Sequence, residues 1–193
     1  MRKGLRAGSI LPVLLLSGCI TSADYPKDWA ATVKGGCDAV AGIYRNAGDR
    51  QSDDWPIGER RTPTFLSQYL VDPLIDPIAS SALEKAERVE ITYAADKLTA
   101  RIGSATAEFS VAAGNLKCTP QGAVIDIHSG SLTPNEKPIA MGYSHTYQTL
   151  MRTADGSLAV RSVNSGVGIV FFFWPVAGSS SSWAHFTSVP ATP

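Results

Sequence analysis

Residues 88–111 read RVEITYAADKLTARIGSATAEFSV, and this stretch decides the fold class. Apolar side chains occupy every second position in three consecutive runs: Val89, Ile91 and Tyr93; Leu98, Ala100 and Ile102; Ala107, Phe109 and Val111. A period of two is the pattern of a strand with one buried face. The breaks at residues 94–96 and 103–104 are typical of tight turns. The stretch therefore predicts consecutive antiparallel strands.

The same pattern continues towards the C-terminus. Asp155-Gly156 predicts a hairpin that joins residues 147–152 to residues 158–163. Residues 167–174 are apolar on both faces, which predicts a central strand covered on both sides. Residues 178–182 are rich in glycine and serine and predict a loop, after which Trp183 starts a last short strand. About eight short strands result, and we expect an antiparallel meander that forms a small barrel or a strongly curved sheet.

One or two short helices are expected before this meander. Thr64 is suited to cap a helix over residues 65–70, in which the apolar side chains fall on one side. Residues 79–88 predict a second helix of one or two turns. The fold class is therefore mainly β with a minor helical part.

Length and charge limit the possible functions. A chain of 193 residues is long enough for one domain with a core, which we place at residues 37–193. The three basic residues Arg2, Lys3 and Arg6 precede the mature chain predicted below, which leaves 14 basic and 17 acidic groups and a net charge of −3. A weakly acidic domain does not attract phosphate backbones, so we expect no nucleic-acid partner.

The N-terminus has the features of an export signal. Arg2, Lys3 and Arg6 precede the apolar run at residues 10–16, which is too short to span a bilayer as a helix. Residues 16–19, Leu-Ser-Gly-Cys, resemble the lipobox of bacterial lipoprotein precursors. This resemblance implies a signal peptide over residues 1–18 and a lipid anchor on Cys19. The alternative is ordinary secretory cleavage after Ala23.

The resemblance also implies a location. Ile20 follows the anchor where an aspartate would favour retention in the inner membrane, so the expected location is the outer membrane, facing the periplasm. The partner implied by the anchor is the membrane itself, because several acyl chains hold a protein stably to a bilayer. Residues 19–36, short and polar, are expected to carry the lipidated cysteine and to serve as a tether.

Cys37 and Cys118 are the two remaining cysteines. In an oxidising compartment they are expected to form one disulfide, and the alternatives are two free thiols or a metal site. A metal site needs three or four ligands at suitable spacing, and neither cysteine has a Cys-x-x-Cys partner or a nearby histidine. The sequence therefore predicts a disulfide, with no metal and no cofactor.

Residues 42–48 contain a glycine and aromatic motif, Gly42-x-Tyr44-x-Asn46-x-Gly48, shortly after Cys37. This opening resembles that of a group of uncharacterised proteobacterial lipoproteins. The resemblance implies a family and no particular chemistry. From the residues alone, Gly42 is expected to relax the backbone at the start of a strand, and Tyr44 to pack in the core.

Catalytic chemistry has no clear signal. His128, His145 and His185 fall on separate predicted strands, and Ser144 and His145 are neighbours whose side chains point to opposite faces. We therefore expect a non-catalytic module that binds an envelope protein or the cell wall, with an exposed aromatic patch that includes Trp55 or Trp183. The alternatives are a barrel that carries a lipid or another apolar ligand, and a hydrolase whose site residues come from distant strands.

Overall fold

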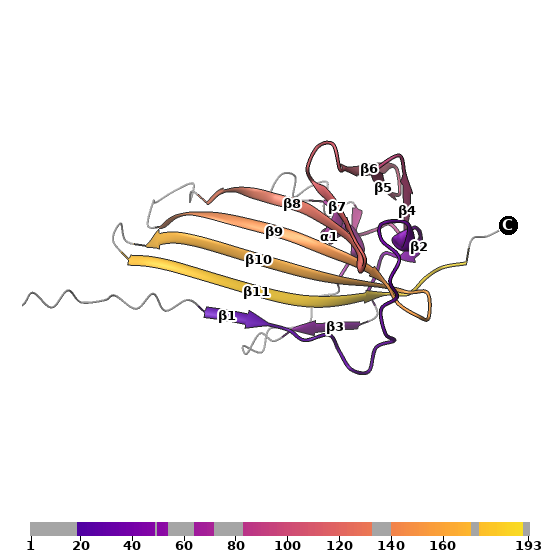
Figure 1. Ribbon diagram of the computed structural model, residues 1–193, viewed down its shortest axis with the longest axis horizontal. Helices are drawn as coiled ribbons and strands as arrows, with labels where there is room; N and C mark the ends of the chain where they lie inside the picture. The colour runs from indigo at the N-terminus through magenta and orange to yellow at the C-terminus, as the bar shows by residue number, and fades with distance from the viewer. Residues whose placement is uncertain are drawn as a thin grey trace, which may run out of the picture.

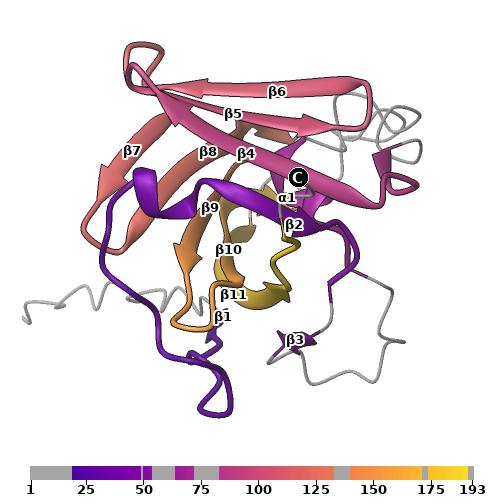
Figure 2. The ribbon, with the colours of Figure 1, turned by 90° about the vertical axis from the view of Figure 1, so that its right-hand side faces the viewer.

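The computed structural model describes residues 19–48, 50–53, 64–71, 83–132, 140–170 and 174–190. The predicted signal peptide, residues 1–18, and Trp55 lie outside these ranges. The fold is mainly β, as predicted, and the strands form two sheets (Figures 1 and 2). The predicted small barrel is wrong, because neither sheet closes on itself.

The larger sheet has seven strands in the order β1-β11-β10-β9-β8-β7, with β3 also paired to β11. The bounds of these strands are β1 Cys19–Ser22, β3 Arg50–Asp53, β7 Leu116–Thr119, β8 Gly122–Leu132, β9 Ala140–Arg152, β10 Leu158–Val170 and β11 Trp174–Phe186. From β7 to β11 each strand pairs antiparallel with the next, which is the predicted meander. β1, the first described strand, instead pairs parallel with the last one.

The smaller sheet has four strands in the order β2-β4-β5-β6. Their bounds are β2 Gly42–Arg45, β4 Arg88–Ala94, β5 Lys97–Ile102 and β6 Ala105–Ser110. The turns at Ala95-Asp96 and Gly103 fall where the sequence predicts them, and all three residues have positive φ angles. Val89, Ile91, Leu98, Ala100 and Ile102 are buried, which confirms the period-two pattern.

Short helical segments accompany the smaller sheet: the 3₁₀ turn η1, Asp38–Val40, and the helix α1, Leu66–Leu70. The helix over residues 65–70 is thus confirmed, but its N-cap is Phe65 rather than Thr64. The Gln68 side chain accepts a hydrogen bond from the Phe65 amide (3.2 Å), so the third residue of the helix satisfies this donor. Of the second predicted helix, residues 79–82 lie outside the described residues. The rest contains a turn in which the Ala86 amide donates to the Leu83 carbonyl (3.1 Å), and β4 begins at Arg88.

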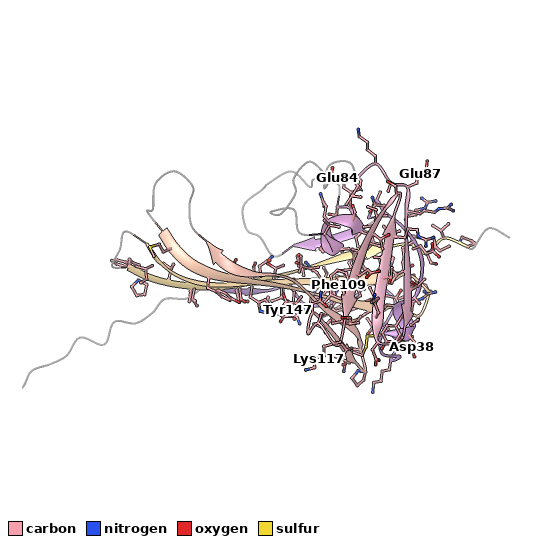
Figure 3. All side chains as sticks on the ribbon, turned by 90° about the horizontal axis from the view of Figure 1, so that it is seen from above. Asp38, Glu84, Glu87, Phe109, Lys117 and Tyr147 are labelled. Atoms are coloured by element: carbon pink, nitrogen blue, oxygen red, sulfur yellow. A yellow bond between two sulfur atoms is a disulfide. The ribbon has the colours of Figure 1, made fainter. Side chains whose placement is uncertain are left out.

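The main core lies between the two sheets. Leu98, Ile102 and Phe109 of the smaller sheet belong to one buried cluster with Leu150 and Phe186 of the larger sheet. The disulfide between Cys37 and Cys118 is present, with Cα atoms 5.2 Å apart, and it joins the residue before η1 to β7. The smaller sheet covers only one end of the larger sheet, and the other end extends as a single layer (Figure 3).

A second, smaller core lies on the opposite face of the larger sheet. Ala23 and Trp29 of the N-terminal segment pack against Met151, Ala159 and Trp183, and the Trp183 indole donates a hydrogen bond to the Ala23 carbonyl (2.9 Å). Residues 19–29 therefore add a strand and a covering layer to the sheet, which differs from the predicted tether. Trp183 is buried by this contact and is not part of an exposed patch.

The β9–β10 hairpin forms at the predicted Asp155-Gly156 turn, with Arg152 opposite Leu158. The Asp155 carboxylate accepts hydrogen bonds from the Thr153 hydroxyl and from the Ser157 amide. These bonds, chiefly the one from Thr153, lower the pKa of Asp155 from its ordinary value, and burial opposes them. Gly156 has φ +85°, a conformation that favours glycine.

Asp155→Ala is expected to lower the free energy of unfolding at pH 7 by about 1 kcal/mol or less, because the turn is exposed. Since the folded state lowers this pKa, the carboxylate stabilises the fold above the unfolded pKa of about 3.9, and this contribution is lost as the pH falls through the folded pKa. Urea unfolding at pH 7 and pH 3 checks this expectation. Thr153→Val is the companion variant, which should weaken the same pH dependence. An equal effect of Asp155→Ala at both pH values contradicts the assignment.

Candidate functional site

The candidate site is the part of the larger sheet that extends beyond the smaller one. We call it the outer sheet and define it as residues 140–146 of β9, 164–170 of β10 and 174–180 of β11. The register aligns these three segments, since Thr146 lies opposite Asn164 and Asn164 lies opposite Ser180. Each segment has seven residues, about 23 Å of strand.

One face of the outer sheet is apolar. Register places Met141 beside Ile169 and Tyr143 beside Val167, with Ala177 next to Val167 on the third strand. Apart from Ala177, these side chains are between 49% and 60% exposed. Full burial of such a side chain contributes about 1.5–3 kcal/mol, so covering half of each contributes roughly 1 kcal/mol per residue. Any partner that covers this face gains several kcal/mol from apolar contact.

The opposite face of the outer sheet consists mostly of small residues. Gly142 and Gly168 lie opposite each other, as do Ser144 and Gly166, and Gly178 follows on β11. Larger apolar side chains return only near the end of this face, where Trp174 is 59% and Val176 is 41% exposed. The outer sheet is therefore amphipathic along most of its length and apolar on both faces near the β10–β11 connection.

The exposure of this region corrects one prediction. Residues 167–174 were expected to form a strand covered on both sides, but Val167, Ile169 and Trp174 are exposed. The reason is that no layer formed by the described residues reaches this far along the sheet, since the smaller sheet and residues 23–29 pack near its other end. Phe171, Phe172 and Phe173 lie outside the described residues.

The predicted loop at residues 178–182 is also wrong, because β11 runs without interruption through Gly178 and the four serines that follow it. Backbone pairing with β10 on one side and with β1 and β3 on the other satisfies this strand. The Ser181 hydroxyl accepts a hydrogen bond from the Ala23 amide (3.1 Å). Tertiary pairing thus overrides the low strand propensity of glycine and serine.

The outer sheet carries no formal charge. Residues 138–151 and 162–193 contain no Asp, Glu, Lys or Arg. Water-exposed sheets usually carry such residues, which keep the surface soluble and protect strand edges from association. An exposed apolar face without charge is typical of a surface that is covered by a partner or by lipid. This signal is visible in the sequence alone, as two long stretches without a charged residue.

A histidine–carboxylate pair lies at the border of the outer sheet. The His145 Nε2 atom is 2.9 Å from Asp126 Oδ2, across a bulge where the β8–β9 register shifts, and both side chains are little more than one third exposed. The Tyr147 ring lies 5.8 Å from the His145 ring. The pair joins one histidine to a carboxylate of the neighbouring strand, a contact that the sequence does not predict. His185 is buried against Trp29, and the side chain of His128 lies outside the described residues.

Among the described side chains around His145, none forms a nucleophile–base arrangement with its ring. The Ser165 hydroxyl donates to the main-chain carbonyl of His145 (3.4 Å) rather than to its ring. Among the described residues, no group of three or more His, Cys, Asp or Glu side chains could hold a metal ion. In the same part of the chain, no helix is long and apolar enough to cross a membrane.

Two hollows flank His145 on the apolar face. The larger, about 430 Å³, is lined by Tyr143, His145, Ser165, Val167 and Ala177, among others. The smaller, about 250 Å³, lies towards β7 beside Lys117, Asp126 and Tyr147. Both lie on the outside of the sheet, unlike the interior cavity expected of a carrier barrel. Met151 is packed in the second core and lines neither hollow.

The residues of the Gly42-x-Tyr44-x-Asn46-x-Gly48 motif lie apart from this surface, and their contacts are structural. Tyr44 is fully buried, and its hydroxyl donates to the Val40 carbonyl (2.9 Å) and accepts from Arg152 Nη1 (2.7 Å). Burial raises the pKa of Tyr44, and the Arg152 guanidinium partly opposes this rise. A Cβ at Gly42, the first residue of β2, would lie 2.8 Å from the Arg152 side chain.

Asn46 and Gly48 hold α1 beside β2. The fully buried Asn46 amide accepts a hydrogen bond from the Ser67 amide (2.9 Å) and donates to the Leu83 carbonyl (3.0 Å). A Cβ at Gly48 would lie 3.1 Å from the Thr64 carbonyl and 3.2 Å from the Phe186 ring. The motif therefore connects the start of the smaller sheet to the helix and to the larger sheet.

Cys19, the predicted lipidation site, lies beside the outer sheet. The β1–β11 register pairs Cys19 with Gly178, and the two strands run in the same direction (Figure 1). Comparison of the chain with protein-family models, with curated proteins and with solved structures finds no match.

Proposed function

We propose that this chain is a lipid-anchored protein of the cell envelope, held in the outer membrane facing the periplasm, and that it acts as a non-catalytic binding module through its outer sheet. The observation that carries the proposal is the apolar face around Tyr143 and Val167, which is about half exposed and carries no formal charge. The anchor is supported by the lipobox resemblance of residues 16–19 and by the pairing of Cys19 with the outer sheet.

A binding role agrees with the chemistry of the site better than a hydrolase does. The Asp126–His145 pair is partly exposed, and the nearby Ser165 hydroxyl donates to a main-chain carbonyl. A partly exposed pair of this kind contributes little to stability, about 0–1 kcal/mol, and among the described side chains it has no aligned nucleophile, which a catalytic pair needs. Its position at a β-bulge supports a local role in joining β8 to β9.

The anchor is tested by metabolic labelling with an alkyne analogue of palmitate. We expect the wild-type chain to incorporate the label and Cys19→Ser to lose it completely, because a serine hydroxyl does not replace the thiol that is acylated. Ser22→Ala, in the same strand and exposed, is the matched control and should be labelled like the wild type. Equal labelling of Cys19→Ser and the wild type refutes the anchor.

The binding surface is tested by thiol accessibility in intact cells. Val167→Cys on the outer sheet and Thr106→Cys on β6 both place a thiol at an exposed strand position. If the outer sheet is covered in the envelope, a water-soluble maleimide should modify position 167 much more slowly than position 106. In the purified, detergent-free chain the two rates should become similar. Equal rates in cells contradict the proposal.

A further inference from the structure

The apolar face of the outer sheet needs a specific occupant, and three observations point to the same one. They are the direction of β1, the length of the outer sheet beyond Cys19, and the chemical composition of that part of the sheet. This inference rests on the proposed lipid anchor at Cys19, and it goes beyond the anchor by assigning a membrane-contacting surface to the folded domain.

The first observation is direction. We call the end of the outer sheet at Trp174 the free end, and the end of the larger sheet at Phe186, under the smaller sheet, the covered end. β1 and β11 are parallel, and both run from the free end towards the covered end (Figure 1). The backbone amine of Cys19 therefore points towards the free end, where Val170 of β10 pairs with Trp174 of β11. If Cys19 is the acylated N-terminus, its backbone amine faces the free end, and the bilayer that holds the acyl chains lies on that side of the domain.

The second observation is length. Gly178, the partner of Cys19, is four residues from Trp174, which is about 13 Å along a strand. The hydrocarbon part of one leaflet is about 15 Å thick, half of the roughly 30 Å core of a bilayer. With Cys19 at the membrane surface, the part of the outer sheet beyond it matches the depth of a single leaflet.

The third observation is composition. The side chains beyond the level of Cys19 include Met141, Val167, Ile169, Trp174 and Val176, all largely exposed. Residues 162–193 contain no charged side chain, whereas a charge is strongly unfavourable in hydrocarbon. Trp174, at the far end of β11, adds a large apolar ring to this part of the sheet.

We infer that the free end of the outer sheet inserts into the leaflet that holds the Cys19 acyl chains, so that the domain contacts the membrane through both lipid and protein. Backbone pairing between β9 and β10 and between β10 and β11 continues to the last described residues of these strands, so the main-chain groups that face these partners are satisfied within the sheet. Among the described strands, residues 174–177 of β11 pair with β10 alone, because β1 begins to pair with β11 only at Gly178. The occupant of the apolar face is therefore lipid, and the covered end, with the smaller sheet, projects into the aqueous compartment.

The test uses the mature lipoprotein, purified from a bacterial envelope and reconstituted into phosphatidylethanolamine–phosphatidylcholine vesicles. A polarity-sensitive nitrobenzoxadiazole label is attached at Ile169→Cys or Val176→Cys, with Thr106→Cys on β6 as the control. In vesicles with brominated acyl chains, we expect the labels at 169 and 176 to be blue-shifted and to lose most of their fluorescence. The label at position 106 should show neither the blue shift nor the quenching. A label at Asn164→Cys, five residues from Ile169 on β10, should be quenched less than the label at position 169.

A second variant makes the result specific to insertion. Ile169→Arg places a charge on the apolar face three residues beyond the level of Cys19, where it is expected to weaken insertion about 30-fold or more. This variant should abolish the quenching at 176 without changing acylation, whereas Thr106→Arg should leave the quenching unchanged. Both positions are exposed, so neither change is expected to prevent folding.

Several outcomes would overturn the inference. A label at 169 that is no more quenched than the one at 106 shows that the sheet stays in water. A blue shift without quenching, which grows with protein concentration, shows that a second copy or another protein covers the face. Mass spectrometry of the same samples reports acylation of Cys19. If Cys19 is acylated and the label at position 169 is not quenched, the inferred insertion fails and the proposed anchor stands. A free thiol on Cys19 refutes both the anchor and the insertion.

Discussion

Replacing Cys37 and Cys118 together with alanine is expected to lower the free energy of unfolding by about 4 kcal/mol. The disulfide closes a loop of 81 residues, so its loss gives the unfolded chain much more conformational freedom. Cys37 is also buried, so its truncation removes apolar contacts as well. A domain of this size has a total stability of about 5–15 kcal/mol, which makes this change a large fraction of it.

Urea unfolding followed by tryptophan fluorescence measures this effect. The wild-type chain under reducing conditions serves as the control, since it should unfold at nearly the same urea concentration as the double variant. A double variant within about 1 kcal/mol of the oxidised wild type would contradict the chain-entropy argument. It would show that the loop is already restricted in the unfolded state.

Asn46→Ala is expected to cost about 3 kcal/mol. Asn46 is fully buried and joins three segments: it follows β2, accepts from the Ser67 amide in α1, and donates to the Leu83 carbonyl before β4. Removing the side chain leaves the buried Ser67 amide without a partner, which costs about 1–3 kcal/mol, and it removes one of the hydrogen bonds that the partly buried Leu83 carbonyl accepts.

The matched control for this prediction is Gln68→Ala in the same helix. Gln68 also makes two side-chain hydrogen bonds, to the Phe65 amide and to Glu84, but its contacts are only partly buried. We therefore expect a loss of about 1 kcal/mol or less for Gln68→Ala in the same urea titration. Equal losses for the two variants would mean that burial is not what makes Asn46 important.

The sequence predicts best those parts of the fold that depend on local pattern. The alternation over residues 88–111 correctly gives β4, β5 and β6, and Asp155-Gly156 correctly gives the β9–β10 hairpin. In these segments the turn residues and the side-chain period determine the structure without help from distant residues.

Other elements could not be predicted because distant segments determine them. Residues 178–182 have the composition of a loop, yet they form a strand because β10, β1 and β3 pair with them. The exposure of Val167 and Ile169 depends on where the smaller sheet ends, and a single strand's pattern contains no information about that. The absence of a barrel likewise follows from the transfer of the chain, between β6 and β7, from one sheet to the other.

In the candidate site, too, some features follow from the local sequence and others depend on distant segments. The uncharged stretch from residue 162 onwards is visible in the sequence and marks the outer sheet. The approach of His145 to Asp126 is not visible, because it depends on a bulge in β8 that shifts the register of two strands. The role of Asn46 also depends on tertiary structure, since its partners Ser67 and Leu83 lie far along the chain.

The pairing of β1 with β11 has a consequence for biosynthesis. The first described strand finds its partner in the last one, since Ser22 lies beside Ser181, so the larger sheet is complete only when β11 is available. In a chain exported and anchored as proposed, the segment around Cys19 would until then have no strand to join and would be accessible to processing enzymes at the membrane. Such long-range closure is slow compared with hairpin formation. The order of events therefore favours modification of the N-terminus first and completion of the sheet afterwards.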